Sequence, residues 1–148
     1  MKRIFLISII LVLLSASIKS QEQFCRFDNE PNQFILASNG VSSPIVVDSA
    51  DFKGVTRAVS HLQKDIYSVT QTSPNLLINN FANNKSLVIV GTLGKSSYIN
   101  NLVKSSKIKS SDIVGKREKF IIQTIASPFP NVDEALVIAG SDMRGTIY

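Results

Sequence analysis

Two pairs of carboxylates are the residues most able to do chemistry. Asp48 and Asp51 follow a β-branched run, and Asp133 and Glu134 are adjacent. Glycoside hydrolysis needs two acids across a sugar-binding cleft, one of which protonates the leaving oxygen. Here Asp48 and Asp51 flank an expected helix start, where acids favour the helix dipole, and Asp133 and Glu134 fall in an expected hairpin loop. Capping and solvation are the favoured roles, so we predict no catalytic residue in this chain.

The segment Gly91–Ser96 imitates a phosphate-binding loop, because it contains Gly94-Lys95-Ser96 between an apolar run and an expected helix. A P-loop also requires a glycine at the position that Ile89 occupies here. Ile89 lies inside the apolar run, and the remaining turn is too short to wrap a phosphate. We therefore predict a tight strand-to-helix turn with an N-cap, and no nucleotide binding.

Metal and cofactor sites are not expected. His61 is the single histidine and Cys25 the single cysteine, so the chain can form neither an internal disulfide nor a transition-metal site from these residue types. His61 is expected on the solvent face of its helix. Neither an arginine-rich stripe nor an acidic cluster with calcium-loop spacing is present. The sequence indicates no nucleic-acid partner, no metal and no cofactor.

The elements that would position these residues alternate between strands and helices. One apolar stripe with helical spacing predicts a helix that Asp51 or Ser49 caps and that ends at Thr72-Ser73-Pro74; its members are Phe52, Val55, Val59, Leu62, Ile66 and Val69. A second, short helix is expected around 97–105, followed by an irregular segment at 107–115. Apolar runs predict strands at 34–37, 44–47, 76–78, 87–90, 120–125 and 135–139, of which the last two form an antiparallel hairpin.

This pattern predicts an α/β fold of α+β character. We expect a mixed β-sheet of about five to six strands with two helices packed on it, followed by a final, truncated helix. That last helix is expected because Gly140-Ser141-Asp142 offers an N-cap to 143–148, which is too short to stand alone. We therefore interpret the chain as a fragment of a longer polypeptide, with an accessory α/β domain at 34–148 that is incomplete at its C-terminus.

Residues 1–20 have the layout of a signal peptide. Lys2 and Arg3 precede an apolar run from Ile4 to Leu14, and small residues follow. The run is shorter than the roughly 20 residues of a spanning helix, so we predict export to the periplasm or outside the cell, without a membrane anchor after processing. Cleavage is expected after Ser20, or alternatively after Ser17, and 21–33 is an N-terminal extension.

The signal peptide also carries much of the basic charge. Removing 1–20 removes Lys2, Arg3 and Lys19 and no acid, and lowers the formal net charge from +5 to +2. The processed chain is therefore close to neutral, which again argues against a nucleic-acid partner.

The order of several segments resembles the N-terminal domain of glycoside hydrolase family 115, the exported xylan α-1,2-glucuronidases. The closing Gly-Ser-Asp-x-Arg-Gly-Thr-Ile-Tyr segment is the most specific of them. The resemblance rests on Ser43–Val55, Leu62–Ile66, Ile89–Ser96, Gly115–Phe120 and Ala135–Tyr148.

The resemblance implies a parent enzyme that removes glucuronic acid or its 4-O-methyl form from xylan. In that family the catalytic acids lie in a (β/α) barrel after this domain, so no family catalytic residue falls on a position here. The implied partner is that barrel of the same polypeptide, with glucuronoxylan reached through the parent enzyme. An independent exported carbohydrate-binding or interaction module is the alternative.

Overall fold

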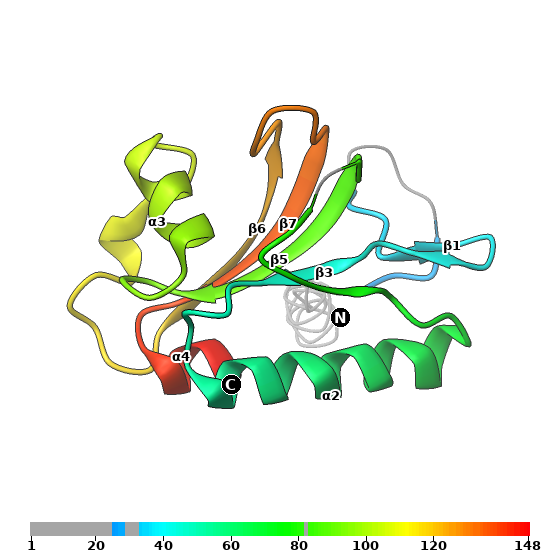
Figure 1. Ribbon diagram of the computed structural model, residues 1–148, viewed down its shortest axis with the longest axis horizontal. Coiled ribbons are helices and arrows are strands. Elements are labelled where there is room, and N and C mark those ends of the chain that lie inside the picture. The colour runs from blue at the N-terminus through cyan, green and yellow to red at the C-terminus, as the bar shows by residue number, and fades with distance from the viewer. Residues whose placement is uncertain (1–24, 29–32, 82) are drawn as a thin grey trace, which may run out of the picture. The chain divides into compact units, whose positions relative to one another are not determined.

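The structure is a computed structural model that describes residues 25–28, 33–81 and 83–148. The chain forms two compact units, residues 1–30 and 31–148. Within the first unit, residues 25–28 are exposed, Cys25 included, and the signal peptide predicted at 1–20 lies outside the described residues. The second unit contains the described helices and strands (Figure 1).

A mixed five-stranded sheet forms the centre of the second unit, in the strand order β4-β3-β5-β7-β6. All neighbouring strands are parallel except the antiparallel pair β6 and β7, which confirms both the predicted fold class and the predicted hairpin. The sheet strands are β3 (Ile45–Val47), β4 (Leu76–Ile78), β5 (Ser86–Thr92), β6 (Phe120–Ala126) and β7 (Glu134–Gly140).

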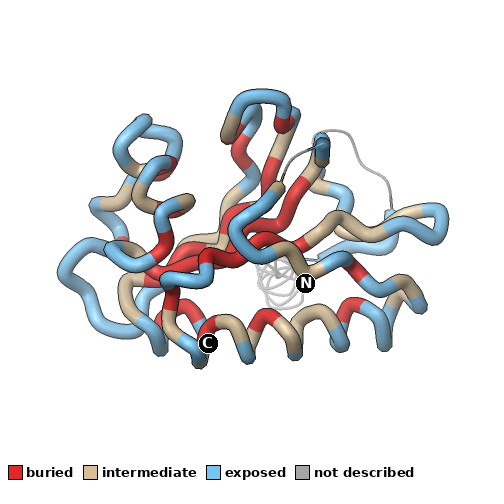
Figure 2. The backbone as a smooth tube through the Cα atoms, viewed as in Figure 1, coloured by how far each residue is buried: buried red, intermediate tan, exposed pale blue. Residues whose placement is uncertain are grey.

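Helix α2 (Lys53–Thr70) and helix α3 (Ser97–Lys104) pack on opposite faces of this sheet. Val55, Val59 and Ile66 of α2 meet alternate residues of β3 and β5, whereas Ile99 and Leu102 of α3 meet the other set. Since successive side chains of a strand point to opposite faces, β3 and most of β5 are buried on both sides (Figure 2). This double burial explains the unbroken apolar runs of the central strands.

Two details of α2 differ from the sequence prediction. Its N-cap is Phe52, which has no side-chain cap, so the predicted cap by Asp51 or Ser49 is wrong. Val69 was expected on the buried stripe but is 66% exposed, because the sheet ends before the last turn of the helix. Gln71 then adopts a left-handed conformation, φ 57°, and its N–H donates to the carbonyl of Tyr67, which closes the helix.

The predicted first strand at 34–37 is also wrong. The strand there is only β1 (Ala37–Ser38), which pairs with β2 (Val41–Ser42). Phe34 and Leu36 lie before it and pack against the α2-side core. The irregular segment at 107–115 contains a short 3-10 turn, η1 (Ser110–Asp112).

The final helix, α4 (Met143–Ile147), packs against the first turn of α2 and the ends of β5 and β7. Gly140 makes this docking possible, because a Cβ there would lie 2.3 Å from the backbone nitrogen of Thr146. Asp142 caps α4 by accepting a 2.8 Å hydrogen bond from the Gly145 N–H. Among the residues described, no helix combines the length and apolar character needed to cross a membrane.

Candidate functional site

The loops that follow β3 and β5 meet at the carboxyl edge of the sheet. From β3 the chain continues to β4 on one side of the sheet, and from β5 it continues to the β6–β7 hairpin on the other. The carboxyl edge between β3 and β5 is therefore the topological switch point, the place where open α/β sheets bind ligands. Both Asp48 and Asp51 lie here, together with the turn 92–97. The sequence predicted neither this meeting nor the partners of the two acids.

Asp48 caps α3 rather than α2. Its Oδ2 accepts hydrogen bonds from the Ser97 N–H at 2.7 Å and from the Ser97 hydroxyl, and its Oδ1 accepts from the Ala50 N–H at 2.8 Å. Burial raises the pKa of Asp48, but these three hydrogen bonds outweigh it and hold the pKa below its ordinary value. Asp48 is therefore an ionised capping group. The same charge, added to burial, raises the pKa of Tyr98.

Asp51 joins β3 to β5 through the backbone. Its Oδ2 accepts from the Thr92 N–H at 2.6 Å, and its Oδ1 accepts from the Phe52 N–H at 2.7 Å. The Thr92 hydroxyl lies 2.8 Å from that of Thr146, which donates to the carbonyl of Asp142. A continuous polar network therefore ties together the ends of β3, β5 and β7.

The hydrogen bonds of this network include the N–H groups in and next to the Gly91–Ser96 turn. Ser96 is the N-cap of α3 and Gly94 has a φ of +80°, as expected for a tight strand-to-helix turn. The N–H groups of Thr92 and Ser97, which a phosphate would need, already donate to Asp51 and Asp48. Two carboxylates of the protein therefore accept the hydrogen bonds that these N–H groups could otherwise donate to a phosphate.

The carboxylates of the second pair, Asp133 and Glu134, also have partners within the protein. Asp133 forms an exposed ion pair with Lys85 at 3.4 Å. Glu134 is the first residue of β7 rather than part of the hairpin loop, and it accepts from the Ser86 hydroxyl at 3.4 Å. Both acids bridge β5 and β7 at the amino edge of the sheet, opposite the edge that holds Asp48 and Asp51. The structure does not bring the two pairs together.

The remaining candidates lie apart. His61 is exposed on α2, as predicted, and Cys25 is exposed in 25–28. In the part of the chain that the structure describes, no three histidine, cysteine or acidic residues gather in a way that could hold a metal ion.

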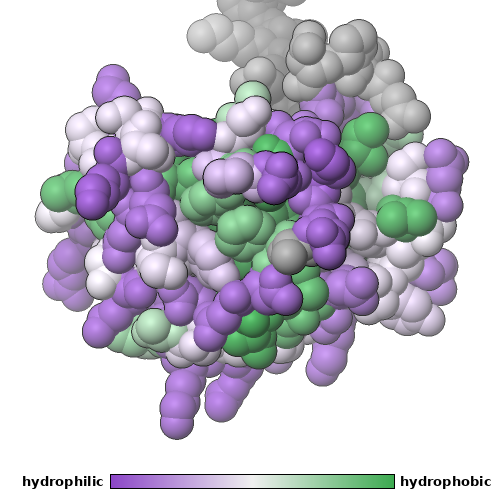
Figure 3. Space-filling view, turned by 45° about the horizontal axis from the view of Figure 1, so that its top comes forward, coloured by the Kyte–Doolittle hydropathy of each residue, from purple (hydrophilic) through white to green (hydrophobic). Residues whose placement is uncertain are grey.

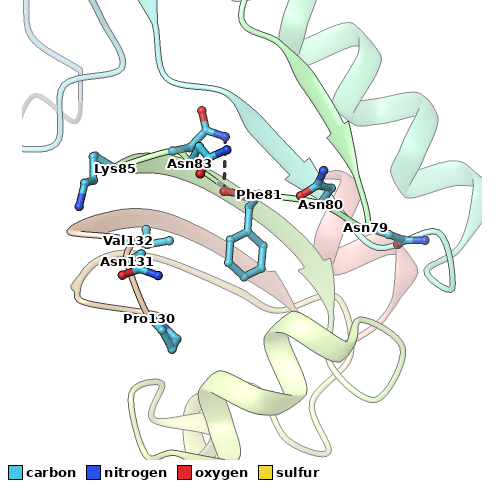
Figure 4. Close-up of a pocket in the computed structure, with 9 residues that line it drawn as sticks. Asn79, Asn80, Phe81, Asn83, Lys85, Pro130, Asn131 and Val132 are labelled. Carbon is cyan, nitrogen blue, oxygen red and sulfur yellow. Dashed lines mark hydrogen bonds between the residues drawn. The ribbon is translucent and has the colours of Figure 1, made fainter.

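Sequence reasoning missed a hollow of about 580 Å³. It lies between residues 79–81 and 83–85, which we call the crossing segment, and the β6–β7 loop at 127–133 (Figure 4). The only signal in the sequence was the asparagine-rich composition of 79–84. The described lining residues are Asn79, Asn80, Phe81, Asn83, Asn84, Lys85, Pro130, Asn131 and Val132.

A half-exposed apolar surface lies on the α2 side of the hairpin. Alternation places Phe120 and Ile122 of β6 on the same side as Leu136 and Ile138 of β7. Helix α2 packs on β3 and β5, and α4 on β5 and β7, so Phe120 is 47% exposed and the other three are half-buried. We call these four residues the hairpin face. Met143 and Ile147 of α4, which are also partly exposed, extend it.

Comparisons with known proteins give a likeness of fold. A solved structure of a family GH115 4-O-methyl-α-glucuronidase with specificity for decorated arabinogalactans matches with a TM-score of 0.52 and 24% identity. The two share a fold. The match covers 72% of this chain and only 12% of the glucuronidase. No protein-family model and no curated protein matches the sequence.

Proposed function

We propose that this chain is an exported, non-catalytic accessory domain of a glycoside hydrolase resembling family GH115. The observation that carries the proposal is the shared fold with a small part of a GH115 glucuronidase. The segments that resemble that family include the turn 92–97 together with Asp48 and Asp51, all at the carboxyl edge of the sheet. These acids accept backbone hydrogen bonds, and such fully used carboxylates are poor proton donors for a glycosidic oxygen.

The hairpin face supports a docking role for the domain. Its occupant in this proposal is the catalytic barrel of the same polypeptide, through which the domain would serve an enzyme acting on glucuronoxylan or a related decorated polysaccharide. Lys116, Arg117 and Lys119 are exposed just before Phe120, and they give the face a basic border. A partner with an acidic rim around an apolar centre is complementary to it.

The docking role predicts that the isolated chain binds a fluorescent dye specific for apolar surface. Phe120→Ser should lower the dye signal with little loss of stability, because the ring is 47% exposed and already forgoes part of its burial energy. Val69→Ser is the matched control, since Val69 is 66% exposed on α2 but lies outside the hairpin face. Equal dye binding by the original chain and the Phe120→Ser variant would contradict the docking role.

The export and non-catalytic parts are tested on secreted protein. Its first residue is expected to be Gln21 or Ile18 by N-terminal sequencing, because the charged, apolar and small-residue regions place the cut there. This material should release no uronic acid from glucuronoxylan in an assay for reducing uronates. Secreted protein that still begins with Met1 would overturn the proposed export and processing. Release of uronic acid that disappears when one carboxylate is changed would overturn the non-catalytic role.

A further inference from the structure

The hollow beside the crossing segment has a rigid frame. The crossing segment runs from the carboxyl end of β4 to the amino end of β5, and Phe81 packs it against the α3-side core. The Phe81 ring stacks on Phe129 at 5.0 Å between centroids and meets the edge of Tyr98 at 5.5 Å. Aromatic pairs of this geometry add stability beyond burial. They hold the crossing segment, the β6–β7 loop and α3 together, so the hollow between the first two is preformed.

The walls combine asparagine amides with an apolar surface. Five of the nine described lining residues are asparagines, and Phe81, Pro130 and Val132 are apolar. The Phe81 ring and the Asn131 side chain lie on opposite sides of the hollow (Figure 4). In the view of Figure 3, which brings the top of Figure 1 forward, hydrophobic side chains lie in the middle of the visible face and hydrophilic side chains surround them. The volume of about 580 Å³ lies in the range of about 300–1,000 Å³ typical of small-molecule sites.

The charges of the lining residues indicate which class of ligand the hollow can bind. Lys85 is the only charged residue among the described lining residues, and its ammonium pairs with Asp133. No unpaired cation attracts a phosphate or a uronate. An asparagine amide both donates and accepts hydrogen bonds, which matches hydroxyl groups that do the same. Ring carbons of a pyranose can pack on Phe81 and Pro130.

We propose that this hollow binds a neutral sugar, as one or two pyranose units of an oligosaccharide. Asn83 and Asn131 supply exposed amides from the two sides, and Phe81 and Pro130 supply the apolar wall. Asn79 has a supporting role, because its side chain accepts from the Ser49 N–H at 2.8 Å and donates to the Ser49 hydroxyl. This inference is independent of the docking role proposed for the hairpin face.

The test is a titration of the ¹⁵N-labelled full chain with xylobiose and with methyl galactoside, followed by amide chemical shifts. At least one of these neutral probes is expected to move the signals of Asn83, Asn131 and Val132 with a dissociation constant on the order of 1 mM. Glucuronate at the same concentration should move them much less.

Asn131→Asp and Asn83→Asp are the informative variants. Both residues have positive φ, 66° and 67°, which aspartate tolerates, so the fold is retained while amide donors are lost. Each variant should weaken neutral-sugar binding by roughly three- to tenfold, as expected for loss of one hydrogen bond. Asn39→Asp is the matched control, because Asn39 has a φ of 51° and lies in the β1–β2 turn. Tighter binding of glucuronate, absence of shifts with both sugars, or equal weakening by Asn39→Asp would overturn the proposal.

Discussion

Replacing Gly140 with alanine is expected to lower the free energy of unfolding by about 3 kcal/mol, the upper end of the usual cost of overpacking. The new Cβ would lie 2.2 Å from Thr146 Oγ1, 2.3 Å from Thr146 N and 2.6 Å from Thr146 Cα. Two of these atoms belong to the backbone of α4, so no change of rotamer relieves the clash. The helix must move away from β7, and the hydrogen bond between Thr92 and Thr146 is lost with it.

Thermal unfolding followed by circular dichroism measures this effect, with an expected drop in Tm of roughly 10 °C. Gly54→Ala is the control, because Gly54 also faces α4 but its Cβ would meet only flexible side-chain ends, Ile147 Cδ1 at 3.1 Å and Met143 Sδ at 3.4 Å. Alanine in the first turn of α2 also has the better helix propensity. A Gly140→Ala variant as stable as the original chain would show that α4 does not dock as described.

Replacing Asp48 with asparagine is expected to cost about 2–3 kcal/mol at pH 7, since hydrogen bonds to a charged group are among the stronger ones. The amide keeps one acceptor, but its NH₂ group can face the Ser97 N–H, and the charge that caps α3 is lost. Chemical unfolding with urea measures the loss. Asp65→Asn is the control, because Asp65 is exposed on α2.

The cost of Asp48→Asn should also depend on pH. The folded-state pKa of Asp48 is lowered, so ionised Asp48 stabilises the fold fully above the unfolded value of about 3.9. This stabilisation is lost as the pH falls from about 5 through 3.9 and through the folded pKa. The original chain and the variant should therefore converge in stability in acid. A difference that stays constant between pH 7 and pH 3 would contradict the capping role of Asp48.

Much of the fold follows from local pattern. The run Leu87–Val90 and the run Ala135–Ala139 are apolar without alternation, which indicates strands buried on both faces. Strand β5 is such a strand, whereas β7 is buried on one face and only half-buried at Leu136 and Ile138 on the other. The stripe through Val55, Val59 and Ile66 predicted α2. The prediction failed at 34–37 and at Val69, where the outcome depends on how far the sheet extends beneath each side chain.

The functional features could be predicted less well, since their parts are far apart in the sequence. Asp48 and Ser97 are separated by 49 positions, and the crossing segment and the β6–β7 loop by about as many. The sequence correctly indicated that 91–96 is a turn with an N-cap, and the absence of a catalytic role for the acids near α2 stays a prediction. It assigned Asp48 to the wrong helix, because the nearest helix start in the chain is not the nearest one in space.

By itself the sequence determined the five strands of the sheet, the helices α2 and α3 and most of their buried sides, because hydrophobic periodicity acts between residues a few positions apart. Only the tertiary structure decided which N–H groups the carboxylates of Asp48 and Asp51 satisfy. It also decided that Phe81 and Asn131 face one hollow. Hydrogen bonds and ring contacts require positions accurate to a fraction of an ångström, and the order of strands in the sheet sets those positions.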